Sequence, residues 1–96
     1  MSKPSEQIEI YGCAYFVILL DYCKTKGILK ETFKFKDFLS EDEMYWWGGH
    51  RKYCDCPLKY GQLRIAFAYG LKHNLLMEVG CSRKLNLLKL KVEGWL

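Results

Sequence analysis

The sequence predicts an α+β fold in which three helices carry a small antiparallel sheet, in the order helix, strand, helix, helix, strand, strand. Two observations indicate this class. Apolar residues recur at helical spacing between residues 57 and 74. From residue 75 onward they alternate with polar residues, as in paired strands, on both sides of a polar turn at 82–84. Because 96 residues hold one hydrophobic core with little room for a second, we expect a single domain, 1–96.

The first helix is predicted to begin at Ser5, whose side chain can cap free backbone N–H groups, and to stop at Gly27. It is apolar over more of its circumference than a three-helix core needs. Either the surplus is covered within the fold, or it meets a second copy of the chain; we favour a homodimer through this helix. The stripe expected to face the core comprises Ile8, Tyr11, Tyr15, Ile18 and Tyr22, broadened by Ala14, Val17 and Leu19.

A short strand is predicted over residues 32–36, where Phe33 and Phe35 alternate with polar residues and would face the core. The second helix is expected to begin at Asp37, or at Ser40, which forms a capping box with the glutamate three residues later. Its expected core contacts are Phe38, Leu39, Met44 and Trp47.

The third helix is predicted over residues 57–73. Pro57 suits the first helical turn, and Asn74 tolerates the left-handed conformation that closes a helix. Its expected buried face comprises Leu63, Ala66, Phe67, Gly70 and Leu71. In the hairpin that follows, Leu75, Met77, Val79 and Cys81 are expected on one face, and beyond the turn Leu88, Leu90 and Val92 alternate with Lys89, Lys91 and Glu93.

Positive charge is concentrated in the second half of the chain, although the net charge is only +4. Residues 50–91 hold nine Lys and Arg against two acids, whereas residues 1–49 are slightly acidic. Such asymmetry is typical of a protein that binds a polyanion. The alternative is that these cations merely solvate a small domain.

The order of elements resembles that of the winged helix-turn-helix family over nearly the whole chain. The segment Leu63–Val79, LRIAFAYGLKHNLLMEV, carries the resemblance: a helix with a Leu-Lys-x-Asn stop runs directly into a hydrophobic strand. Members of the family usually have Gly where Asn74 stands. The Cys-containing, Tyr-rich composition is also similar to that of small proteins of thermophilic archaea and their viruses.

The resemblance implies sequence-specific binding of double-stranded DNA without a cofactor, by a transcriptional regulator of the cytoplasm (the host cytoplasm if viral). In this family the third helix enters the major groove and the wing, here 82–84, touches the backbone or minor groove. Arg can donate two bonds to guanine and Gln can pair with adenine, whereas Lys mostly contacts phosphate. The implied DNA-binding residues are Lys59, Tyr60, Gln62 and Arg64 on the helix, Arg51 and Lys52 before it, and Arg83 and Lys84 at the wing tip.

The predicted third helix is less polar than a typical recognition helix, because Ile65 and Tyr69 are expected on its exposed side. This departure leaves an alternative, a winged-helix module that binds another protein and not DNA. Its contact surface would be this side or the apolar first helix.

Neither an enzyme nor a membrane protein is predicted. The acidic run at 41–43 is typical of a solvated helix start, and no orienting group accompanies His50 and Cys54. The most apolar run, 12–20, is too short to cross a bilayer.

The five cysteines leave three interpretations open: buried thiols, at least one disulfide, or zinc ligation. If a disulfide forms, Cys54 or Cys56 is its expected member, because a loop gains most from being tied down, and an intersubunit bridge is a further alternative. A zinc site would need His50, Cys54 and Cys56 with His73 or Cys81, but the single-residue gap between Cys54 and Cys56 is tighter than structural zinc sites use. We therefore predict no metal.

Overall fold

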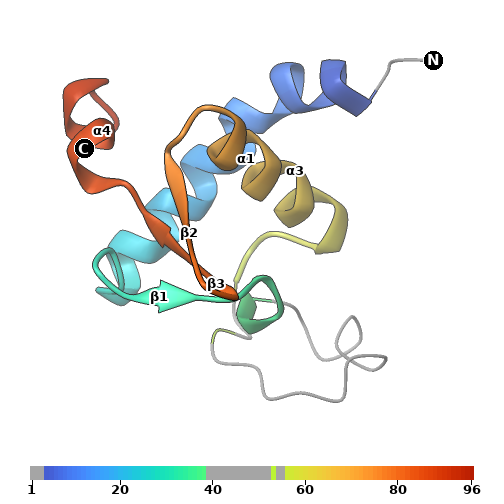
Figure 1. The fold of residues 1–96 in the computed structure, drawn as a ribbon. Coiled ribbons are helices and arrows are strands. Elements are labelled where there is room, and N and C mark those ends of the chain that lie inside the picture. Colours follow the sequence, from blue (N-terminus) through green and yellow to red (C-terminus); the bar gives the residue numbers. More distant parts are fainter. Residues whose placement is uncertain (1–3, 39–52, 54–55) are drawn as a thin grey trace.

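The computed structural model describes residues 4–38, 53 and 56–96 (Figure 1). Within these residues three α-helices and a short 3-10 helix accompany a three-stranded antiparallel sheet of order β1-β3-β2, which confirms the predicted α+β class. The predicted second helix, with Leu39, Met44 and Trp47, lies outside the described residues except at its start. The elements are α1 (Pro4–Lys26), β1 (Thr32–Phe33), the 3-10 helix η1 (Phe35–Phe38), α3 (Tyr60–Lys72), β2 (Leu76–Val79), β3 (Ser82–Leu85) and α4 (Leu87–Val92).

Two glycines allow α1 and α3 to pack closely side by side. A Cβ atom on Gly12 would lie 2.6 Å from Cδ2 of Tyr69, and one on Gly70 would lie 2.8 Å from Cε1 of Phe16 and from Cδ1 of Leu76. Each distance is too short for a real contact. The two helix backbones therefore approach one another where neither glycine carries a side chain, and the hairpin closes over the same place.

The buried face of α1 differs from the predicted stripe. Leu19 and Tyr22 are buried as expected, but Tyr11, Val17 and Ile18 are exposed. The helix is apolar nearly all round, so its periodicity does not select a face; the glycine contact with α3 does. It begins at Pro4 and not after a Ser5 cap, and it ends before Gly27, whose φ of +71° confirms the predicted stop. The buried residues of α1 are Gly12, Phe16, Leu19, Leu20, Tyr22 and Cys23.

The first strand is shorter than predicted. It ends at Phe33, because the carboxylate of Asp37 accepts the backbone N–H of Lys34 at 2.8 Å and turns the chain into η1. Phe33 and Phe38 are buried as predicted, whereas Phe35 belongs to η1 and is partly buried.

The third helix matches its prediction closely. It begins at Tyr60, three residues after Pro57, and Asn74 follows its end with a φ of +60°. Leu71, the fifth residue of the predicted face, is only partly buried. The four residues confirmed as buried are Leu63, Ala66, Phe67 and Gly70.

The hairpin turns earlier than predicted, at Gly80 and Cys81, and residues 82–84 form part of strand β3. Gly80 supplies the positive φ, +62°, that the turn requires. Along β2 the prediction of faces was also wrong: Leu75 and Leu76 are buried, while Met77 and Val79 are exposed. Leu75 precedes the strand, and beyond Leu76 the hairpin extends past the core.

The predicted last strand is a helix. Asn86 begins α4 because its side-chain oxygen accepts the backbone N–H of Lys89 at 3.3 Å. Leu90 is then fully buried, one turn along. The amide nitrogen of Asn86 also donates to the carbonyl oxygen of Asn74 at 3.0 Å, and its backbone N–H donates to Leu75 at 2.9 Å. One residue thus joins the end of α3, the base of the hairpin and the start of α4.

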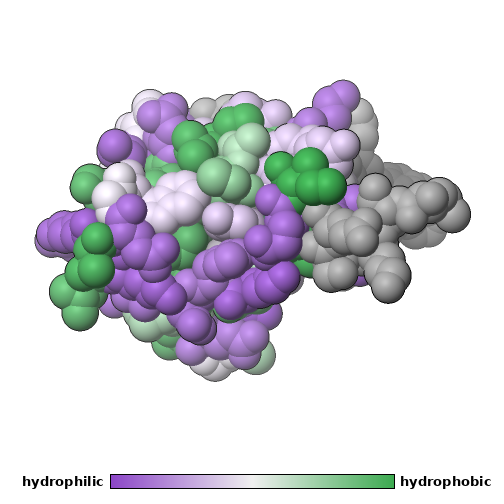
Figure 2. All heavy atoms as spheres, turned by 90° about the horizontal axis from the view of Figure 1, so that it is seen from above, coloured by the Kyte–Doolittle hydropathy of each residue, from purple (hydrophilic) through white to green (hydrophobic). Residues whose placement is uncertain are grey.

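The core lies between α1, α3 and the sheet, with Trp95 packing against it from the C-terminal end. In the described part of the chain no helix has the length and apolarity that crossing a membrane requires. Figure 2 shows hydrophobic spheres at the left-hand end of the molecule, over α4, where Leu88 and Val92 are exposed.

Candidate functional site

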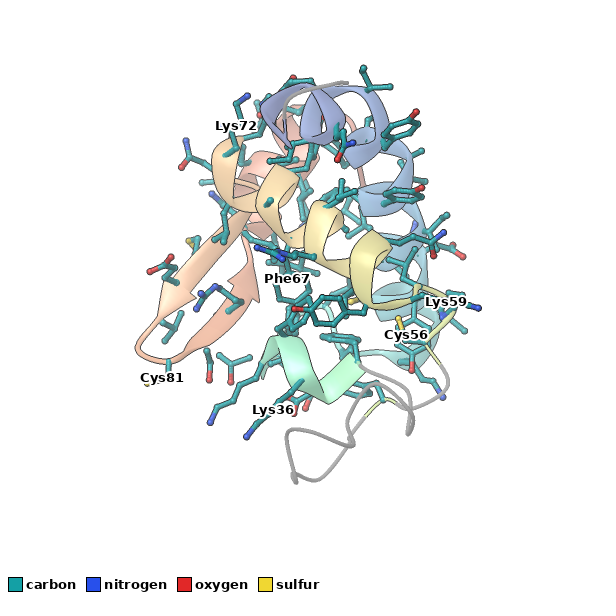
Figure 3. All side chains as sticks on the ribbon, turned by 90° about the vertical axis from the view of Figure 1, so that its right-hand side faces the viewer. Lys36, Cys56, Lys59, Phe67, Lys72 and Cys81 are labelled. Atoms are coloured by element: carbon teal, nitrogen blue, oxygen red, sulfur yellow. The ribbon has the colours of Figure 1, made fainter. Side chains whose placement is uncertain are left out.

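A pocket of about 580 Å³ lies between α3, the β2–β3 hairpin and the start of η1. Figure 3 labels one lining residue from each element: Phe67 of α3, Lys36 of η1 and Cys81 at the hairpin tip. We call this pocket the basic groove, because four of its lining residues are Lys or Arg and none is acidic. It is lined by Lys34, Phe35, Lys36, Tyr60, Arg64, Phe67, Ala68, Leu71, Cys81 and Arg83.

Aromatic rings form one wall of the basic groove and hold η1 against α3. Phe35 makes edge contacts with Tyr60 and with Phe67, with ring centroids 5.5 and 5.4 Å apart. Phe67 also contacts Phe33 and Phe38 behind it. Such edge-to-face pairs are favourable beyond the area they bury, so the wall is a fixed surface.

The cations around the basic groove have few partners of their own. Within the described residues, Lys34, Lys36 and Arg64 form no ion pair. Arg83 lies on the central strand, where one terminal nitrogen donates to the carbonyl oxygen of Ser82 at 3.3 Å and the other lies 3.9 Å from a carboxylate oxygen of Glu78. Its Nε is buried and has no hydrogen-bond partner among the residues that the structure describes. Positive charge therefore converges on a space that contains no neutralising group from its own lining.

The structure brings three of the predicted site residues together. Tyr60, Arg64 and Arg83 all line the basic groove, although Arg83 does so from strand β3 and not from the hairpin tip, where the sequence had placed it. Lys84 is also in the strand, opposite Thr32 and Met77, and is not among the lining residues.

Two other predicted residues cap the start of α3. Gln62 accepts the backbone N–H of Lys59 through its side-chain oxygen at 3.2 Å. Figure 3 shows Lys59 on the side of α3 away from the hairpin tip, outside the basic groove. Arg51 and Lys52 lie outside the described residues.

Lys34 and Lys36 line the basic groove but were missed as site residues. The signal was present, because the predicted alternation that turns Phe33 and Phe35 inward turns Lys34 and Lys36 outward. Tyr69, by contrast, was expected on the exposed side of α3 beside Ile65. It is partly buried between the helices and packed on Phe16, and its ring is tilted by 39° against that of His73 with ring centroids 4.4 Å apart.

A second polar cluster joins the start of α1 to the end of α3. One carboxylate oxygen of Glu9 lies 2.8 Å from Nζ of Lys72 and 3.0 Å from Nε2 of His73. The bond from Lys72, and then that from His73, lowers the pKa of the Glu9 carboxyl. This cluster is exposed and ties the two helices together at their ends.

The cysteines described by the structure do not gather into a metal site. No group of three or more potential ligands occurs among the described residues, and the predicted members His50 and Cys54 fall outside them. Cys13 and Cys81 are exposed thiols, and Cys23 is a buried one. Burial, with a smaller contribution from Cys56, raises the pKa of Cys23 to about 12.

The comparisons with known proteins add no relative. No family model, no curated protein and no solved structure matches the chain. A function therefore has to be argued from α3, the hairpin and the basic groove between them.

Proposed function

We propose that the chain is a winged helix-turn-helix protein that binds double-stranded DNA and regulates transcription. The observation that carries the proposal is the basic groove, which is bounded by a helix and by the hairpin that follows it directly. A helix of this kind fits the major groove of B-DNA, and a hairpin beside it can follow the adjacent backbone. The concentration of cations at their junction, three of which form no ion pair within the described residues, supports a polyanionic ligand.

The residues divide into two roles. Arg64 is exposed on α3 and can reach base edges, where its guanidinium donates two bonds to guanine. Lys34, Lys36 and Arg83 contact phosphates, because they stand around the helix and not on its outward surface. Lys59 and Lys84 are further phosphate contacts at the edges of this surface, while Arg51 and Lys52 stay as sequence-based predictions.

The test is a selection of bound duplexes from a random pool, followed by binding measurements on the selected site and on a scrambled one. Arg64→Ala should reduce the preference for the selected site. Lys36→Ala should weaken binding to both duplexes alike. Lys91→Ala, which removes an exposed cation on α4 away from the basic groove, is the matched control and should change neither. Absence of binding to any duplex at low salt would overturn the proposal.

The second candidate is a winged-helix module that binds another protein. It is favoured by the exposed apolar residues on the outside of the fold, among them Ile10 and Val17 of α1 and Leu88 of α4. In the DNA-binding proposal the α1 residues serve instead as the contact between two copies of the chain, which makes the regulator a homodimer. If DNA binding is retained when the apolar residues of α1 are made polar, the surface that binds DNA is separate from the apolar surface of α1.

A further inference from the structure

The side of α1 that faces away from α3 is apolar and exposed. Successive residues of a helix are separated by about 100°, so residues 10, 11, 14, 17 and 18 fall within one arc about 120° wide. The fully buried Phe16 and Cys23 lie on the opposite side of the helix. We call this arc the outer face: Ile10 and Tyr11, which are 61% and 50% exposed, Ala14, which is also exposed, and Val17 and Ile18, which are 48% and 40% exposed.

The outer face has apolar residues at matching distances before and after Ala14. Ile10 and Ile18 stand four residues before and after it, and Tyr11 and Val17 stand three residues before and after it. Two copies of α1 that cross at Ala14 in opposite directions would therefore place each Ile10 against an Ile18, and each Tyr11 against a Val17. A surface that complements itself under a two-fold rotation is what an isologous dimer requires.

The polar residues at the two ends of the outer face favour an antiparallel pair of helices over a parallel one. Gln7 and Asp21 lie seven residues before and after Ala14 and are both exposed. In an antiparallel pair, Asp21 of one copy meets Gln7 of the other, whose amide can donate to the carboxylate. Asp21 also lies there beside the positive N-terminal end of the partner helix. In a parallel pair the two Asp21 carboxylates would face each other and repel.

We propose that two copies of the chain associate through an antiparallel pair of α1 helices that cross at Ala14. The inference rests on the homodimer of the proposed function and gives it a register. An alanine at the crossing point permits helix axes as close as about 8 Å. Because α3 packs on the opposite side of α1, this dimer leaves both copies of the basic groove uncovered.

The first experiment measures the mass of the full-length protein in solution by sedimentation equilibrium over a range of concentrations. The unmodified chain should form a dimer. Ala14→Arg places two cations at the crossing point and should give the monomer mass, with an unchanged circular dichroism spectrum because Ala14 is exposed. Leu88→Arg, the same kind of change on the exposed face of α4, should leave the dimer intact. A monomeric unmodified chain, or an Ala14→Arg variant that remains dimeric, would overturn the inference.

The second experiment tests the crossing point at Ala14 by disulfide formation. With helix axes about 8–10 Å apart, the two Ala14 Cα atoms face each other at about 3.5–5.5 Å, within or near the range a disulfide spans. Ala14→Cys in a Cys13→Ser background should therefore form a covalent dimer under mild oxidation. The Cys13→Ser protein alone, which retains the exposed thiol of Cys81, should not.

The two results also separate this inference from the rest of the proposal. Neither measurement uses DNA, so a failure of DNA binding leaves the pairing of α1 standing. A dimer that Ala14→Cys does not cross-link would overturn the crossing at Ala14 while leaving the homodimer and the DNA-binding surface in place.

Discussion

The salt dependence of DNA binding tests the basic groove directly, because four cations line it and no acid does. Three of them, Lys34, Lys36 and Arg83, are proposed phosphate contacts, and Lys59 and Lys84 at the edges bring the number to five per protomer. If each neutralises one phosphate, the logarithm of the binding constant should fall with the logarithm of salt concentration with a slope of about −4.5 per protomer. Affinity then drops by about 500-fold between about 50 and 200 mM salt. Lys36→Ala removes one of the five contacts, so the slope should become shallower by about a fifth, whatever the number of protomers on the duplex.

The assay is fluorescence anisotropy of a labelled duplex, titrated with protein at several concentrations of a monovalent salt. Lys91→Ala removes a cation of α4 and should reproduce the slope of the unmodified protein. The two variants carry the same net charge, so a general effect of charge would flatten both slopes equally. Equal slopes for the two variants would refute a phosphate contact at Lys36.

Three further predictions concern stability and thiol chemistry. Gly12→Ala should lower the free energy of unfolding by about 1–3 kcal/mol, because the methyl group has no room between α1 and α3. Gly61→Ala, in open space on α3, should raise the free energy of unfolding by about 1 kcal/mol. Urea denaturation measures both changes. The folded-state pKa of Glu9 lies below its ordinary value of 4.5, so its bonds to α3 stabilise the fold above that pH and are lost as pH falls through the lowered value. The unfolding free energies of the unmodified protein and Glu9→Gln should therefore differ at neutral pH and converge in acid, and a constant difference would contradict this. Cys23, with its pKa raised to about 12 by burial, should resist alkylation at pH 8 while Cys81 reacts, as peptide mass spectrometry would show; rapid labelling of both would contradict the structure.

The sequence was most informative where a segment is amphipathic. Leu63, Ala66 and Phe67 were placed correctly on the buried face of α3, because polar residues separate them from the rest of the helix. The apolar α1 carries no such contrast, and the choice of Phe16 over Tyr11 as a core residue depends on the close approach of α3. That approach involves residues far apart in the chain, which periodicity does not report.

The hairpin and the basic groove show the same limit. The segment after Asn86 reads either as alternation or as the start of a helix, and the cap that this side chain provides decides between them. Arg64 and Arg83 were identified as candidates by residue type, but their convergence with Lys36 depends on how η1 is held by the aromatic wall. The local sequence pattern identified several of the cations, and tertiary packing brings them together.

The position of Asn86 has a mechanical consequence for the hairpin. By holding the turn after α3 and the first turn of α4 at once, it anchors the root of the hairpin, while Gly80 at the opposite end has open space around it. Bending should therefore be confined to the Gly80 end of the hairpin, and the angle between the root of the hairpin and α3 should stay constant. If the groove of a bound duplex differs slightly in width, the tip of the hairpin alone would move to contact it, and α3 would keep its position.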